Sequence, residues 1–116
     1  MRFLPFAIAG LLICAPAVAE TIPDATLAAI SEAATAGYAD PGAAEVINVR
    51  KSLARNGSGY CGEVSEDGAA GTFTVFHVVL ETGSGVPSVI RLADFPEAGT
   101  QRDTVTTLLT NFGCTN

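Results

Sequence analysis

The sequence predicts an α+β domain, a four-stranded antiparallel meander with an N-terminal and a C-terminal helix packed on one face. Apolar residues recur at helical spacing near both ends of the mature chain. Between them, short β-branched and aromatic segments alternate with glycine-rich turns, as in a meander. Two cysteines, Cys61 and Cys114, are placed to tie the second helix to the sheet.

The first residues are typical of a secretory signal. An apolar run through Ile13 ends at Ala17-Val18-Ala19, a small-x-small cleavage site directly before Glu20. We therefore expect residues 1–19 to be a signal peptide and residues 20–116 to form a single domain, periplasmic or secreted. A lipoprotein signal ending at Cys14 is the alternative, but such signals favour a small residue where Ile13 stands.

The mature chain would be acidic. Removing residues 1–19, which contain Arg2 and no acidic residue, leaves 97 residues with five basic and twelve acidic side chains, a formal charge of −7. Nucleic acids and anionic membranes require a basic surface, so the charge argues against both as partners. After Glu20 no apolar run approaches the roughly 20 residues that span a bilayer, and we expect no membrane span.

Cys61 and Cys114 are the thiols that remain after cleavage, and in an oxidising compartment we expect them to form a disulfide. They lie 53 positions apart, so loop entropy gives a stabilisation of about 4 kcal/mol, comparable to the whole stability of so small a domain. Buried free thiols and intermolecular pairing are the alternatives. There is no Cys-x-x-Cys pair and His77 is the only histidine, so we predict no metal and no cofactor.

The first helix is predicted over Pro23–Ala36, with Gly37 as its terminator. The apolar residues at helical spacing are Leu27, Ile30 and Ala34. Asp40 can then cap a short helical turn that runs through about Val46, with Pro41 at its first position.

Four segments have the composition of strands. The third has the strongest β signal, with apolar residues on both of its faces, so it should be central. The first could also be part of one longer helix over 43–55, but its β-branched Ile47 and Val49 favour a strand. The predicted strands are Ile47–Ser52, Tyr60–Ser65, Thr72–Glu81 and Val86–Ala93, joined by turns at 56–59, 66–71 and 82–85.

A second helix follows the loop Asp94–Gly99. Thr100 and Asp103 have the spacing of a capping box, and Gly113 ends the helix directly before Cys114. The residues of its apolar face are Val105, Leu108, Leu109 and Phe112. A disulfide from Cys114 would pin this helix to the second strand.

Several of these residues resemble a pattern found in small exported bacterial proteins of an uncharacterised family. That pattern is Asp-Pro-x-Ser-Ala-x-Phe-Arg-Asn-Val, then Cys-Gly-Glu-Val-Asn, then Gly-Gly-aromatic-x-x-Phe. The resemblance covers roughly residues 40–80 and implies export and a shared domain, but no reaction. The matching residues are Asp40-Pro41, Ala44, Asn48-Val49-Arg50, Cys61-Gly62-Glu63-Val64, Gly71, Phe73 and Phe76, while Ala43, Val46, Ile47, Ser65 and Thr72 depart from it.

Glu63 is the most conspicuous polar residue, because alternation along a strand places it on the same face as Cys61. A carboxylate beneath a helix needs partners, and Arg50 or Arg91 on neighbouring strands could provide them. A structural role, as an ion pair or as a carboxylate that caps backbone N–H groups, is the interpretation we favour over a general acid or base or a ligand anchor. Neighbouring Gly62 suggests a close approach by Phe73 or Phe76.

His77 completes a candidate polar cluster with Glu63, Arg50 and Arg91. Glu63 could orient the imidazole as a base for a hydroxyl nucleophile, but the spacing selects none of Ser58, Ser65 or Thr74. There is no Gly-x-Ser-x-Gly elbow either, so a half-exposed structural histidine is the favoured interpretation.

The sequence contains no convincing catalytic motif. We therefore expect a non-catalytic domain that binds a protein or small ligand in the cell envelope. One alternative is an envelope hydrolase that uses Glu63. The other is a secreted inhibitor or effector that blocks a partner with the loop Glu66–Gly71.

Overall fold

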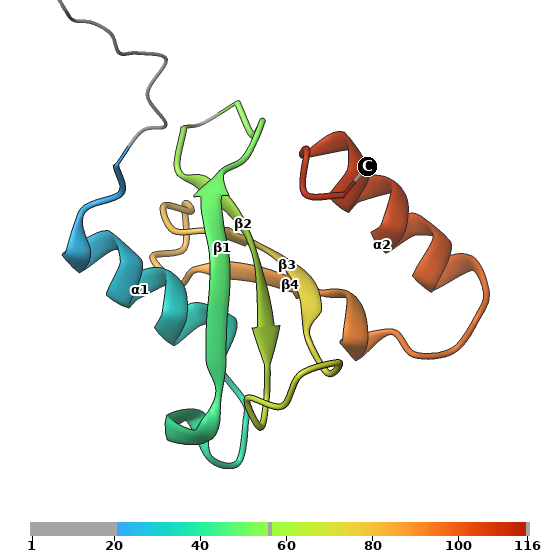
Figure 1. The fold of residues 1–116 in the computed structure, drawn as a ribbon. Helices are drawn as coiled ribbons and strands as arrows, with labels where there is room; N and C mark the ends of the chain where they lie inside the picture. Colours follow the sequence, from blue (N-terminus) through green and yellow to red (C-terminus); the bar gives the residue numbers. More distant parts are fainter. Residues whose placement is uncertain (1–20, 56, 116) are drawn as a thin grey trace, which may run out of the picture.

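A computed structural model describes residues 21–55 and 57–115 of the chain. The predicted signal peptide at 1–19, with Cys14, lies outside the described residues together with Glu20, Asn56 and Asn116, so cleavage and export stay predictions. The elements, in chain order (Figure 1), are α1 (Asp24–Ala34), the 3-10 helix η2 (Pro41–Ala43), β1 (Glu45–Lys51), β2 (Gly59–Ser65), β3 (Thr74–Val79), β4 (Ser88–Arg91), the 3-10 helix η3 (Leu92–Asp94) and α2 (Thr100–Asn111).

The four strands form one antiparallel sheet in the order β1-β2-β3-β4, which confirms the meander. The segment at 45–51 is a strand, so the long helix considered for 43–55 is excluded. β3 and β4 are shorter than predicted because each borders a turn, and η3 takes up the last residues assigned to the fourth strand.

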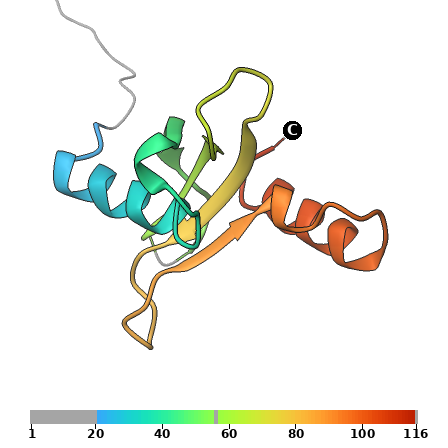
Figure 2. The same ribbon diagram turned by 90° about the horizontal axis from the view of Figure 1, so that it is seen from below.

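The two helices lie on opposite faces of the sheet (Figures 1 and 2), which corrects the expectation that both pack on one face. Tyr60 and Val64 of β2 pack in the α1 cluster, whereas Cys61 between them packs in the α2 cluster. β3 divides in the same way, with Phe76 on the α1 side and Val75 on the α2 side. A strand that is apolar on both faces requires a cover on both faces.

The core on the α1 side is continuous across the sheet. Its fully buried residues are Ile30, Ala34, Val64, Phe76 and Val78. Gly62 lies directly under the ring of Phe76, where an added Cβ would stand 2.5 Å from Cζ. The predicted packing role of this glycine is therefore confirmed, with Phe76 as the covering aromatic.

The helix ends follow the sequence only in part. Gly37 and Gly113 both have positive φ after a helix, as predicted for terminators. Asp40 is the N-cap residue of η2 and Pro41 its first residue, as predicted, but Asp40 makes no side-chain cap and η2 ends at Ala43 instead of near Val46. The capping box predicted at Thr100 is wrong, because Gly99 is the N-cap of α2 and Thr100 is already helical. Among residues 21–55 and 57–115, no helix is long and apolar enough to cross a membrane.

The end of α2 forms a Schellman motif that turns the chain toward the sheet. The Gly113 amide donates to the Thr110 carbonyl, and the Cys114 amide donates to the Leu109 carbonyl at 2.8 Å. This turn brings Cys114 to β2, where it forms the predicted disulfide with Cys61 at a Cα–Cα distance of 5.2 Å.

Candidate functional site

The four polar residues of the predicted cluster are divided between the two faces of the sheet. Arg50, Glu63 and His77 project to the α2 side, in register with Cys61 and Val75. Arg91 projects to the α1 side and bonds to the end of α1. The structure therefore does not bring the four side chains together.

Glu63 pairs with an amide rather than with an arginine. The Asn48 Nδ2 group donates to Glu63 Oε1 at 3.3 Å, in an exposed position. Asn48 sits in a bulge of β1 with φ of 58°, a conformation that asparagine tolerates better than most residues. Arg50 is close by but donates to the Asn48 carbonyl at 3.0 Å and to the Cys114 carbonyl at 2.9 Å.

His77 is buried, with 2% of its surface exposed, and not half-exposed as the sequence suggested. Its Nε2 lies 2.9 Å from Ser52 Oγ, a hydroxyl that the sequence analysis did not consider. Its ring stacks on Phe112 with a centroid distance of 4.0 Å. Burial lowers the pKa of His77. The tautomer of the ring decides which of the two atoms donates, and Ser52 Oγ also accepts from the Ala54 amide.

The Ser52–His77 pair spans three strands over a glycine. A Cβ on Gly59 would stand 2.5 Å from Ser52 Oγ and 2.9 Å from His77 Nε2. The pair has the atoms of a nucleophile and its base, but Phe112 covers the imidazole and Glu63 bonds elsewhere. Its evident role is to join the end of β1 to β3 across β2.

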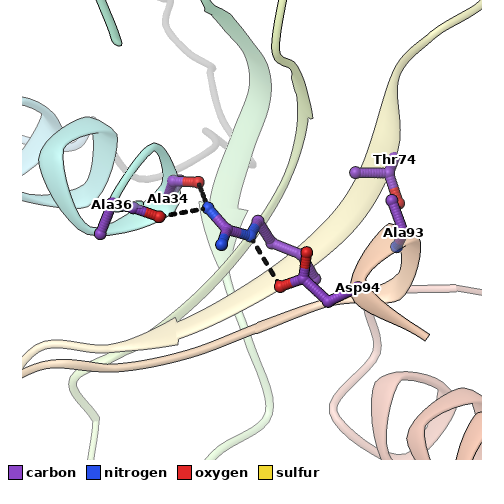
Figure 3. A network of polar contacts seen from close by, with 6 residues as sticks. Ala34, Ala36, Thr74, Ala93 and Asp94 are labelled. Atoms are coloured by element: carbon purple, nitrogen blue, oxygen red, sulfur yellow. Dashed lines mark hydrogen bonds and ion pairs between the residues drawn. The ribbon is translucent and has the colours of Figure 1, made fainter. Parts of the chain in front are cut away.

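Arg91 connects β4 to the end of α1 (Figure 3). Its Nη1 donates to the carbonyls of Ala34 and Ala36, both at 2.8 Å, and its Nε bonds to Asp94 at 3.0 Å. The guanidinium lies 4.6 Å from the centre of the Tyr38 ring. A cation here satisfies the free carbonyls and complements the negative end of the helix dipole.

A cavity of about 560 Å³ opens beside this arginine, on the α1 side of the sheet. Antiparallel topology brings its parts to one end of the sheet: the segment before β1, the β2–β3 loop and the turn after β4. Its lining contains one aromatic residue, Tyr38, and four acidic residues. These acidic residues are Asp40, Glu66, Asp67 and Asp94.

Electrostatics at the cavity are dominated by carboxylates. Burial raises the pKa of Tyr38, Asp94 and Glu66 raise it further, and Arg91 opposes them. Asp94 is already bonded to Arg91. The carboxylates of Asp40 and Glu66 make no hydrogen bond or ion pair to the described residues.

The β2–β3 loop that forms one wall of the cavity is braced from within. Asp67 Oδ1 accepts from the Ala69 amide at 3.0 Å and from the hydroxyls of Thr72 and Ser65 at 3.0 and 3.1 Å. These hydrogen bonds hold the pKa of Asp67 below its usual value. The wall therefore has a defined shape, although its residues are exposed.

Sequence analysis did not foresee this cavity, because its acidic residues are scattered through loops and follow no motif. The predicted meander was the feature of the sequence that could have indicated the cavity, because the ends of four antiparallel strands bring those loops together. Among the described residues, no group of three or more histidines, cysteines and carboxylates could hold a metal ion. A scan against protein-family models and searches of curated proteins and solved structures each gave no match, so the family resemblance stays a prediction.

Proposed function

We propose that the chain is an exported, non-catalytic binding domain of the cell envelope, and that the cavity beside Tyr38 binds a positively charged group. The cavity is the observation that carries this proposal. Its volume of about 560 Å³ lies within the range of roughly 300–1,000 Å³ common for ligand pockets.

The lining specifies the chemistry of the ligand. All of its charged side chains are acidic, and Asp40 and Glu66 have carboxylates available for a new partner. The Tyr38 ring and the methyl groups of neighbouring alanines provide apolar contact for an alkyl stem. An amine or guanidinium on a short stem matches this combination, and the formal charge of −7 that remains without residues 1–19 attracts cations toward the surface.

The same geometry favours binding over the two alternatives. A hydrolase built on Glu63 lacks support, because this half-buried carboxylate is held by the Asn48 side chain in a hydrogen bond that is open to solvent. An inhibitory loop at Glu66–Gly71 has the required rigidity, but the loop serves here as a wall of a hollow.

The proposal can be tested by titrating the isotopically labelled exported protein with arginine amide and following its backbone amides by NMR. Citrulline amide, which has the same shape and the same α-amino group but a neutral urea in place of the guanidinium, is the matched ligand. We expect arginine amide to shift the backbone amides of residues 38–40, 42–43, 66–67, 72–74 and 93–94, and citrulline amide to shift them much less.

Two double variants provide a second test of the proposed site. Asp40→Asn/Glu66→Gln should weaken arginine amide binding at least about fivefold, because it removes a charge-assisted contact of about 1 kcal/mol. Glu81→Gln/Glu97→Gln changes the net charge equally at exposed positions outside the cavity. Equal weakening by both variants, or shifts spread over the whole surface, would contradict a site in the cavity.

A further inference from the structure

α2 covers its face of the sheet with few of its own side chains. Only Val105 and Leu109 of the helix are buried, and they contact a small cluster around Cys61. The core between α1 and the sheet is a separate cluster on the opposite face, centred on Phe76 and Ile30. The sheet and α1 therefore have a packed core to which α2 contributes nothing.

The attachment of α2 is concentrated in the three residues Phe112–Cys114. The Phe112 ring stacks on His77, and its carbonyl accepts from the Leu53 amide at 2.9 Å. The Cys114 carbonyl accepts from Arg50, and its sulfur is bonded to Cys61. We call Phe112–Cys114 the anchor, since all of these contacts hold one end of α2.

The other end of α2 follows an irregular segment that can serve as a hinge. The segment between η3 and α2 ends at Gly99, which has φ of 145°. Arg102 near the start of α2 bonds to the Phe95 carbonyl at 2.7 Å, a contact within the hinge region itself. Movement about this segment would leave that contact in place while the anchor separates from the sheet.

We propose that the Cys61–Cys114 bond is a redox latch: its reduction by a dithiol releases the anchor and lets α2 move away from the sheet. Opening exposes the apolar surface around Val75 and Ile90 and admits water to the Ser52–His77 pair. The cavity beside Tyr38 lies on the other face, so the latch does not depend on the binding proposal.

The reduction is a thiol–disulfide exchange. A thiolate of the dithiol attacks Cys114 Sγ, because Cys114 is 5% exposed whereas Cys61 is fully buried. The S–S bond breaks, a mixed disulfide forms, and Cys61 leaves as a thiolate. The second thiol of the dithiol then closes a cyclic disulfide and expels the Cys114 thiolate. The dithiol supplies two electrons and two protons, and the protein ends with two thiols.

Once the bond is broken, the anchor depends on contacts that water can replace. The Leu53 amide and the Arg50 guanidinium belong to residues with exposed surface, so both can exchange their carbonyl partners for solvent. The remaining contacts are the aromatic stack and the burial of Val105 and Leu109 in the small cluster around Cys61, and most of the α2 surface already faces solvent. The covalent bond is therefore the contact that keeps the anchor in place.

Two neighbouring backbone amides distinguish release of the anchor from loss of the sheet. The exported protein is reduced with dithiothreitol without denaturant, alkylated to confirm two free thiols, and followed by amide hydrogen exchange. The Leu53 amide bonds to the anchor, whereas the Ser52 amide bonds to Gly59 at the end of the sheet. We expect reduction to lower the protection of Leu53 at least about tenfold and that of Ser52 less than about twofold.

The single histidine gives an independent readout. In the oxidised protein the stacked ring of Phe112 should shift the His77 ring protons upfield, and we expect this shift to disappear on reduction. Cys61→Ser/Cys114→Ser should reproduce the reduced state without a reagent. In oxidised Phe112→Leu, the shift should be lost while Leu53 stays protected, because the disulfide still holds the backbone of the anchor.

Three results would overturn the latch. Unchanged Leu53 protection with both thiols alkylated would mean that packing alone holds α2. Loss of protection throughout the sheet would mean that the bond supports the entire fold. Resistance of the native bond to dithiothreitol would mean that the buried sulfurs are out of reach.

Discussion

At the scale of single residues, Gly62 has the tightest constraint in the α1-side core. The Phe76 ring occupies the space that a side chain at Gly62 would take, and Phe76 is fully buried. We predict that Gly62→Ala lowers the free energy of unfolding by about 2–3 kcal/mol, as in overpacked cores. Urea denaturation measures the change. Gly83→Ala is the matched control, since nothing lies within 4 Å of its Cβ position, and an equal loss there would contradict the steric cause.

Asn48 carries a second residue-scale prediction, because its φ of 58° is unfavourable for a residue with an ordinary side chain. Asn48→Ala should cost about 1–2 kcal/mol of stability. Asn48→Gly removes the same amide contact with Glu63 but accepts the positive φ, so its cost should be smaller. Equal losses in the two variants would assign the effect to the hydrogen bond instead of the backbone.

The two residues differ in how far sequence reasoning could identify them. Gly62 lies in a buried strand next to aromatic residues, so close packing could be inferred from its neighbours. Asn48 lies between the β-branched Ile47 and Val49, so the sequence indicates a residue with low strand propensity but does not indicate a bulge. A bulge depends on the pairing of β1 with β2, which the sequence of one strand does not contain.

At the scale of elements, Arg91 holds α1 on the sheet. It bonds to two carbonyls at the end of α1 and to Asp94, and only 11% of its side chain is exposed. Arg91→Met should lower stability by about 2 kcal/mol, since hydrogen bonds from a charged donor are lost and the carbonyls remain. Arg55→Met, at an exposed site, should change it by less than about 0.5 kcal/mol. Similar losses would show that α1 does not depend on this cap.

The arrangement of elements was only partly predictable. Strand number, order and both helices follow from periodicity and turns within short segments. The face that each helix covers depends on which residues of β2 and β3 meet it, and the disulfide fixed only the face of α2. Val75 and Phe76 are adjacent and both apolar, so the sequence of β3 already required a cover on each side. The predicted polar cluster does not form for the same reason: Arg91 lies on the α1 face of the sheet, away from the other three members.

At the scale of the whole molecule, the two faces have different responses to pH. On the α2 face, burial lowers the pKa of His77 below its ordinary value of about 6.5. On the opposite side of the sheet, hydrogen bonds lower the pKa of Asp67 below about 4. Both groups bind protons more strongly in the unfolded chain, but their titrations fall in separate pH ranges.

The difference between the pH ranges in which His77 and Asp67 titrate leads to a prediction about acid unfolding. The folded state disfavours protonation of His77, so its contribution to stability is complete above the unfolded pKa of about 6.5 and falls as the pH drops toward the lower, folded pKa. The free energy of unfolding should therefore decrease below pH 6.5, by at most about 1.4 kcal/mol per pH unit. The Asp67 contribution should be lost only at more acidic pH, below about 4.

His77→Gln separates the two groups, because glutamine does not titrate and can still hydrogen-bond to Ser52. Urea denaturation of the wild type between pH 7 and 5 should show a falling midpoint, while His77→Gln should show a nearly constant one. Both proteins should lose stability below about pH 4, where the carboxylates are protonated. A falling midpoint in both proteins above pH 5 would assign the effect to another group, and the buried imidazole would then have no part in the acid response of the fold.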